Sequence, residues 1–303
     1  MFKNALYFIT DNRRNRMTKM RRSAESAFEE LKKRFVFKDY IIGDSGQWMS
    51  VGRTVEKYLS IGDKVFDLGS GPCDKTAIAQ YMGCKCTAVD DLKDDWHLRK
   101  NNIELIEKFA SSSGIEFSRD FSPPATNQFS MVMMNDVLEH IHDSPREILN
   151  VLVNGLKEGG YLFVTVPNLA NIRKRLDLMR GKTNLPPYIL YYWYSGTWRG
   201  PQREYVRGDL EAMSSNLGLE IVELRGVHHM LQRLPRLAQG PYKLATAVFP
   251  DWRDSWLLVA RKPEGWKAKD ELSTDEEFGK IFGATSNQSL YNFEQPPLYE
   301  TGV

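Results

Sequence analysis

Cysteines and long apolar runs are both scarce in this chain of 303 residues. Its three cysteines, Cys73, Cys84 and Cys86, are too few for a disulfide framework, and they have no partner pair of His or Cys at zinc-site spacing. We therefore expect free thiols in a reducing compartment and no metal site. No apolar run approaches the ~20 residues that span a bilayer, and the run at residues 6–9 is too short for a signal peptide. These absences predict a cytoplasmic protein without a membrane span.

The chain also has little net charge, but its two ends carry opposite signs. The formal charge is +2, whereas residues 12–38 hold ten Lys and Arg against three Glu, and residues 264–303 hold eight acids against three Lys. Apolar side chains recur at helical spacing within the basic segment, at Ala24, Ala27, Phe28, Leu31 and Phe35. We predict an amphipathic helix whose basic side chains are solvated. Peripheral contact with an anionic surface through residues 12–38 is the alternative.

A loop that contains two glycines is the most informative feature of the sequence. Residues 64–68 form a short apolar strand, Gly69 and Gly71 permit close approach of a ligand to the backbone, and residues 76–82 suit a helix. Asp90 ends the next strand about 20 residues on, where an acid usually accepts hydrogen bonds from ribose hydroxyls. The pattern predicts a nucleoside ligand at the carboxyl edge of a parallel sheet.

The residue at position 74 separates three classes of ligand. A dinucleotide loop needs a third Gly at this point, but Asp74 stands there and would place a carboxylate beside a pyrophosphate. Lys75 and Thr76 also approach the end of an ATP-binding P-loop, in which a Gly again precedes the Lys. What remains is a nucleoside ligand without phosphate that carries a cationic group near Asp67.

Four ordered segments carry a wider pattern. Asp67-Leu68-Gly69-Ser70-Gly71-Pro72-Cys73 is followed by a strand that ends at Asp90, by residues 129–140 (FSMVMMNDVLEH) and by residues 156–168 (LKEGGYLFVTVPN). Together they resemble the class I S-adenosylmethionine-dependent methyltransferases, whose first motif is acid-x-Gly-x-Gly-x-Gly; Cys73 departs from its last Gly. The resemblance implies a Rossmann-like α/β fold with a seven-stranded sheet, an N-terminal helical cap and insertions on the acceptor side. It implies S-adenosylmethionine as the cofactor.

The resemblance also implies roles for individual residues. The methionine end of the cofactor would meet the first motif, the ribose would meet the acid after the second strand, and the adenine amino group would meet an acid after the third. Polar residues after the fourth strand would border the cofactor. The predicted cofactor-binding residues are, in chain order, Asp67, Gly69, Ser70, Gly71, Asp90, Asp120, Asn135 and Asp136.

His140 is our candidate for the catalytic base. Asp136 and His140 are four residues apart, and we place both on one face of the helix after the fourth strand. Their segment is similar to the Glu-x-x-Glu-His of quinone-type O-methyltransferases and of some amine methyltransferases. An imidazole accepts a hydroxyl proton at neutral pH without a metal. The alternative is a structural His140, with His142, His228 and His229 as rival bases.

The acceptor side is predicted from two later segments. Arg203 and Tyr205 lie in a stretch similar to methyltransferases of glycan and natural-product pathways, and would orient a hydroxylated or anionic acceptor. Six aromatics between residues 188 and 198, Tyr192 and Trp193 among them, would form a lid that excludes water. Packing of an insertion against the N-terminal cap is the alternative for this cluster.

We therefore predict a methyltransferase that acts on a hydroxyl or carboxyl oxygen of a small molecule or glycan. N- or C-methylation, a silent cofactor-binding protein and an RNA-binding protein are the alternatives. Asn135-Asp136-Val137-Leu138 lacks the Pro-Pro-aromatic pattern of enzymes that methylate planar amino groups of bases, so we do not expect a nucleic acid as the acceptor. The predicted organisation is a cap at residues 1–60, a methyltransferase domain at 61–263 with insertions at 169–208 and 228–254, and an acidic tail at 264–303.

Overall fold

The computed structural model describes residues 20–41, 45–229, 231 and 234–269. The described residues up to Ala268 belong to one compact unit, and of the residues beyond it only Lys269 is described. The basic segment before residue 20 and the acidic tail after residue 269 lie outside the described residues, so the predictions made for them stay predictions.

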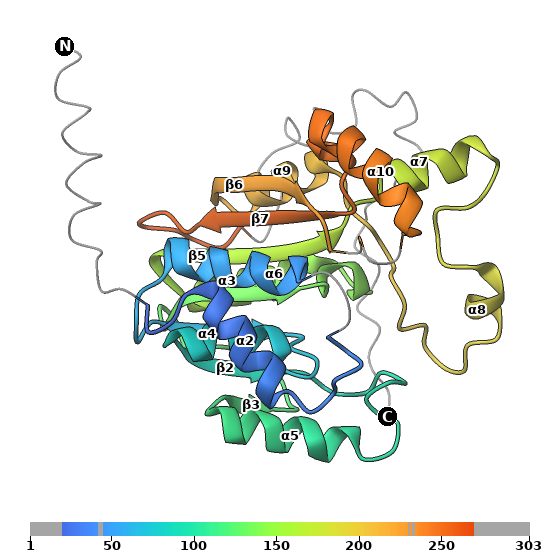
Figure 1. Cartoon of the computed structure of the whole chain (residues 1–303). Coiled ribbons are helices and arrows are strands. Elements are labelled where there is room, and N and C mark those ends of the chain that lie inside the picture. The colour runs from blue at the N-terminus through green and yellow to red at the C-terminus, as the bar shows by residue number, and fades with distance from the viewer. Residues whose placement is uncertain (1–19, 42–44, 230, 232–233, 270–303) are drawn as a thin grey trace, which may run out of the picture. The chain divides into compact units, whose positions relative to one another are not determined.

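A seven-stranded sheet forms the centre of this unit (Figure 1). The strand order is β3-β2-β1-β4-β5-β7-β6; neighbours from β3 to β5 pair parallel, and β7 pairs antiparallel with both β5 and β6. The strands are β1 (Lys64–Leu68), β2 (Lys85–Val89), β3 (Glu116–Ser118), β4 (Phe129–Asn135), β5 (Leu156–Pro167), β6 (Glu220–Val227) and β7 (Ser255–Arg261). This topology confirms the predicted Rossmann-like α/β fold.

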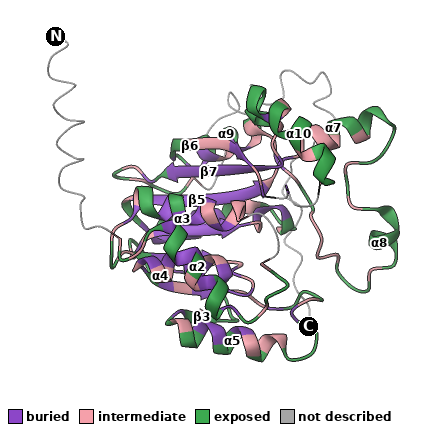
Figure 2. Ribbon diagram, viewed as in Figure 1, coloured by how far each residue is buried: buried purple, intermediate pink, exposed green. Residues whose placement is uncertain are grey.

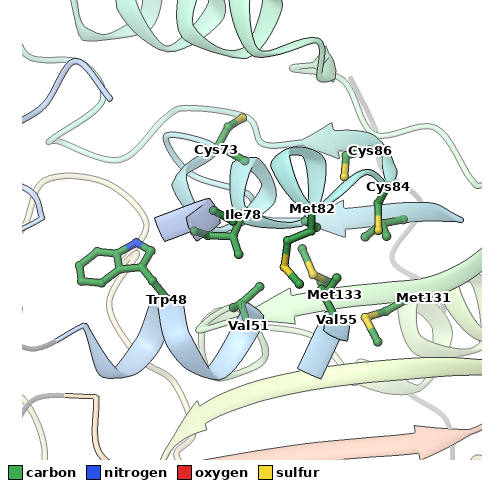
Figure 3. Packing of buried hydrophobic residues seen from close by; sticks show 14 of the residues in the cluster. Trp48, Val51, Val55, Cys73, Ile78, Met82, Cys84, Cys86, Met131 and Met133 are labelled. Atoms are coloured by element: carbon green, nitrogen blue, oxygen red, sulfur yellow. The ribbon is translucent and has the colours of Figure 1, made fainter. Parts of the chain in front are cut away.

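Helices cover both faces of the sheet, because successive strand residues point to opposite faces and both sets are apolar. Val65 packs with α2 to α5 on one face, whereas Phe66 packs with α6 and α9 on the other. Figure 3 shows part of the first cluster, in which Trp48 and Met133 take part. The helices are α2 (Ala24–Arg34), α3 (Gly46–Tyr58), α4 (Asp74–Met82), α5 (Asn102–Ser113), α6 (Pro145–Gly155) and α9 (Arg207–Asn216).

The N-terminal helices belong to the same core as the sheet. The apolar residues of α2 that we predicted to face inward are buried, and its basic last turn faces solvent, which confirms the amphipathic assignment. Ser23 caps α2 by accepting a hydrogen bond from the Ser26 amide, an interaction worth about 1 kcal/mol. Trp48 of α3 is 1% exposed and stacks with Phe28 of α2. The two helices thereby pack into the same hydrophobic core as the sheet.

One local prediction is wrong. The segment after β4 is not an α-helix, so Asp136 and His140 do not share a helical face. Asp136 adopts a positive φ of 59° while its amide donates to the Thr165 carbonyl, and only a short 3-10 helix, η1 (Leu138–His140), follows. The next α-helix, α6, begins later, at a Ser144 cap followed by Pro145. The turn at Asp136 breaks the helical spacing on which the prediction depended.

The two insertions hold short helices at the surface. The first contains α7 (Ile172–Met179) and α8 (Tyr188–Tyr192), and the second contains α10 (Arg236–Val248) and the 3-10 helix η3 (Pro250–Trp252). Figure 2 shows α8 with its residues exposed. Among the described residues, no helix has the length and apolar character to cross a membrane.

Candidate active site

A cavity of about 1220 Å³ lies at the carboxyl ends of β1 and β4. The strand order reverses between these two strands, and ligands of open α/β sheets bind at such a point. Most of the residues predicted for the cofactor line this cavity together with the candidate base: Asp67, Gly69, Ser70, Gly71, Asp90, Asn135, Asp136 and His140. The sheet thus brings together residues that are up to 73 positions apart in the sequence.

The glycine loop adopts the left-handed backbone that glycine permits. Gly69 has a φ of +69°, and a Cβ placed on it would lie 2.3 Å from a Val137 methyl carbon. Gly71 has a φ of +53°, and Cys73, which departs from the family's Gly, has a φ of 62°. The left-handed backbone explains why a Gly suits the position of Cys73. The Cys73 side chain is buried, with its sulfur 3.6 Å from the Ser70 hydroxyl.

Asp67 is a buried carboxylate at the floor of the cavity. Its Oδ2 accepts a hydrogen bond from the Thr76 hydroxyl at 2.5 Å, whereas Oδ1 has no partner among the described residues. Burial raises the pKa of Asp67 to about 7, against the opposing effect of the Thr76 hydrogen bond. An unpartnered buried oxygen of this kind suits a cationic ligand group, because a buried acceptor without a hydrogen bond is costly.

Asp90 accepts hydrogen bonds from the backbone of the glycine loop and of the segment that follows β2. Its Oδ2 accepts from the Gly71 amide at 2.7 Å, and its Oδ1 accepts from the Leu92 amide at 2.8 Å. A carboxylate has about four acceptor sites, so each oxygen retains capacity for one more donor. Asp90 therefore holds the glycine loop and still offers acceptors to a diol such as ribose.

An ion pair joins the two sides of the cavity floor. The Lys75 ammonium lies 2.7 Å from Oδ2 of Asp136. Although burial raises it, the pKa of Asp136 is lowered overall by the charge of Lys75. The neighbouring Asn135 is 6% exposed; its carbonyl oxygen accepts from Thr165, and its amide nitrogen has no partner among the described residues. This amide is the second buried polar group of the cavity left for a ligand.

Residues before the glycine loop complete the cavity, and the sequence motifs did not indicate them. Tyr40 and Trp48 line it together with Asp74, whose Oδ2 accepts a 2.6 Å hydrogen bond from the Trp48 indole. Asp74 begins α4, so its carboxylate lies at the helix end where phosphates bind, which agrees with the exclusion of a phosphate ligand. The helical spacing of Trp48, Val51 and Val55 predicts a buried face but gives no signal for a binding role.

His140 and Glu139 occupy the other side of the cavity. The Nδ1 atom of His140 lies 2.8 Å from the Arg199 carbonyl oxygen, and its Nε2 atom lies 4.0 Å from Oε1 of Glu139. Glu139 is 2% exposed, and its Oε2 has no partner among the described residues. Burial first, and then the charge of Asp136, raise the pKa of Glu139 to about 8. Burial therefore favours the protonated form of Glu139, which carries a hydrogen that it can donate.

Five predicted residues do not line the cavity. Asp120 is exposed, although its neighbours Arg119 and Phe121 are part of the lining. Tyr192 and Trp193 of the α8 region are 60% and 72% exposed. The remaining two have intramolecular partners: the Arg203 guanidinium lies 3.2 Å from Asp209, and the buried Tyr205 hydroxyl donates to the Leu138 carbonyl. Their roles toward cofactor or acceptor stay predictions.

The cavity fits S-adenosylmethionine. Asp67 and Asn135 supply buried polar atoms that have no partner in the described part of the chain. Asp90 supplies acceptors at the glycine loop, and Gly69 leaves no room for a side chain against Val137. When bound, S-adenosylmethionine supplies an electrophilic methyl group, and the protein must orient an acceptor toward it. Fold and site together define a class I S-adenosylmethionine-dependent methyltransferase.

Comparison with known proteins gives the family. The model of the methyltransferase domain family matches residues 20–224, and the chain belongs to this family. No curated protein sequence matches the chain. Two similar solved structures are S-adenosylmethionine-dependent methyltransferases, from Methanosarcina mazei (17% identity, 69% of this chain and 97% of that chain covered, TM-score 0.47) and Archaeoglobus fulgidus (15%, 84% and 99%, 0.46). A third is Haemonchus contortus phosphoethanolamine N-methyltransferase 2 with bound S-adenosyl-L-methionine (15%, 78% and 56%, 0.46). These likenesses identify no acceptor.

Proposed function

We propose that the enzyme methylates a hydroxyl or carboxyl oxygen of a small molecule or glycan, and that His140 is its base. The hydrogen bond from the His140 ring to the Arg199 carbonyl is the main support for this proposal. A carbonyl oxygen only accepts, so Nδ1, at 2.8 Å from the Arg199 carbonyl, holds the ring hydrogen. Nε2 then keeps its lone pair and is the atom that takes a proton from the acceptor.

The size of the cavity supports a second ligand beside the cofactor. Small-molecule sites commonly measure about 300–1,000 Å³, and the 1220 Å³ of this cavity exceeds that range. His140 and Glu139 line it together with residues of the first insertion, on a different element from the glycine loop. For a hydroxyl acceptor, the oxygen would form the new bond to the methyl carbon as the methyl–sulfur bond breaks. The hydroxyl proton would pass to Nε2 of His140, and S-adenosylhomocysteine would leave.

Several further assignments are part of this proposal. We also propose a cytoplasmic location, and domain boundaries after residues 60 and 263. N- or C-methylation remains the alternative chemistry, and it needs the same cofactor site. A silent binder or an RNA-binding protein would bind cofactor or oligonucleotide without turnover, and an RNA-binding protein would show a steep salt dependence of oligonucleotide affinity.

Replacement of His140 tests the proposal. We expect His140→Ala to lower kcat by about 10²–10⁴ with nearly unchanged affinity for S-adenosylhomocysteine, because the ring acts on the acceptor proton. The measurement is release of S-adenosylhomocysteine with a panel of hydroxylated acceptors. His142→Ala is the matched control, since His142 also lines the cavity and contacts Gln202 rather than a carbonyl. If His142→Ala lowers kcat more than His140→Ala does, His142 is the base instead. If His140→Ala weakens cofactor binding as much as it lowers kcat, His140 has a structural role.

A further inference from the structure

A strongly apolar surface covers the first insertion. We call residues 172–193, which include α7 and α8, the α7–α8 segment. Ten of its large apolar side chains are between 41% and 83% exposed, from Leu176 at the lower value to Met179 at the upper. In α8 the exposed fractions include 70% for Tyr188 and 60% for Ile189 (Figure 2). Isolated exposed apolar residues are ordinary, but ten of them within one segment of 22 residues indicate an interaction surface.

The core of the protein does not hold these helices. Neither α7 nor α8 contains a buried residue. The rings of α8 contact one another, as Tyr188 does with Tyr192 at 5.8 Å between ring centres. If these side chains turn toward an external apolar phase, no buried side chain of either helix has to leave the core.

The net positive charge of the α7–α8 segment indicates which kind of surface it would contact. It carries five Lys and Arg against one acid, Asp177. Arg180 pairs with Asp177 and Lys174 pairs with Glu204. The other three cations form no ion pair within the described residues. Arg173 lines the cavity and has a buried Nε, Arg175 donates to the Ala170 carbonyl, and Lys182 is exposed. Cations without ion-pair partners, together with exposed Tyr, Trp and Leu, are typical of segments that lie in the interface of an anionic bilayer.

We propose that the α7–α8 segment docks the protein on an anionic phospholipid bilayer. A second copy of the chain is the less suitable occupant, because a two-fold interface would place two positively charged segments against each other. The bilayer offers negative charge for the exposed Arg175 and Lys182, and an apolar layer for the side chains of α8.

Docking at this surface has a consequence for the cavity. Asn184, Leu185 and Pro186 connect α7 to α8 and also line the cavity. Leu185 is 64% exposed, so one residue belongs both to the docking surface and to the cavity rim. Bilayer contact would bring this rim to the lipid surface, where an amphipathic acceptor is concentrated. The inference goes beyond the proposed oxygen methylation and does not depend on it.

Vesicle binding of the full-length chain tests the inference. We expect sedimentation with vesicles of equimolar phosphatidylcholine and phosphatidylglycerol, and little with phosphatidylcholine alone. Ile189→Ser/Leu190→Ser should lower the partition coefficient about tenfold or more. Ile61→Ser is the matched control, because Ile61 is 46% exposed and precedes the amino end of β1, whereas the α7–α8 segment follows the carboxyl end of β5. All variants should keep the wild-type affinity for S-adenosylhomocysteine, which shows that they are folded.

A spectroscopic measurement locates the contact independently. Brominated phospholipids should quench tryptophan fluorescence of the wild type, and Trp193→Phe should remove much of that quenching while retaining most vesicle binding. The inference is overturned if the double variant binds as the wild type does, since contact through the basic N-terminal segment would then explain the binding. It is also overturned if the wild type does not bind vesicles, or if the double variant instead abolishes a dimer in vesicle-free solution.

Discussion

Two acids of the cavity titrate close to neutral pH because they are buried. The pKa of Asp67 is raised to about 7 and that of Glu139 to about 8, and each has one oxygen without a partner among the described residues. Asp67 lies at the glycine loop and Glu139 beside His140. Under the proposed function, Asp67 would face the cofactor and Glu139 would face the acceptor. Their protonation should therefore affect different measurements.

Cofactor affinity should depend on the ionisation of Asp67. Below pH 7 the carboxyl is protonated, and it loses the charge that attracts the ammonium of the cofactor. We expect the affinity for S-adenosylhomocysteine to fall as the pH drops through 7, by at most about tenfold per pH unit for a single proton. Calorimetry between pH 5.5 and 8.5 measures this, with Asp67→Asn as the comparison. If wild type and variant have the same pH dependence, another group is responsible.

Glu139 should act in its protonated form as a positioning residue for the acceptor side. Because Gln resembles a protonated Glu, Glu139→Gln should retain most methyl transfer at pH 7, whereas Glu139→Ala should lose about tenfold by leaving a buried gap. Above pH 8 the wild type should decline relative to the Gln variant, because only the wild type ionises. A pH–rate profile of the three proteins decides the question. A large loss for the Gln variant at pH 7 would show that the carboxylate form is needed.

At the scale of elements, the turn from β1 to α4 must pass closely under the segment after β4. Gly69→Ala should destabilise the fold by about 1–3 kcal/mol beyond the strain of its positive φ, because its Cβ would overlap Val137. Gly62→Ala provides the control: its φ is +84°, and a Cβ there meets nothing within 4 Å. The difference between the two variants in chemical denaturation isolates the overlap. Equal destabilisation would mean that the turn simply shifts to accommodate the methyl group.

The elements differ in how far their sequence specifies them. β1 was predicted from its short apolar run, and β4 and β5 were predicted because their segments resemble strand motifs of the family. In the structure all three contribute apolar side chains to both faces of the sheet. The segment after β4 was not predicted correctly, since the positive φ of Asp136 depends on a hydrogen bond to Thr165 of a strand about 30 residues away. Local spacing contains no information on such a tertiary contact.

At the scale of the whole molecule, the cavity combines three separate parts of the chain. The central motifs supply Asp67 and Asp90, and these were found from the sequence because Gly and Asp occur there at a family spacing. Trp48 comes from a helix before the motifs, and Glu139 is distinguished from any other helical Glu only by its burial. The insertion contributes a carbonyl, that of Arg199, and backbone atoms have no sequence signature.

Calorimetric titration with S-adenosylhomocysteine tests the central claim, that this cavity binds the methyl donor, most directly. We predict one site per chain, and a loss of about 1.5–3 kcal/mol for Asp90→Ala, because its carboxylate would accept charge-assisted bonds from the ribose. Asp120→Ala is the comparison, since Asp120 does not line the cavity. Tighter binding of NAD or ATP than of S-adenosylhomocysteine, or an unchanged affinity in the Asp90 variant, would contradict the account.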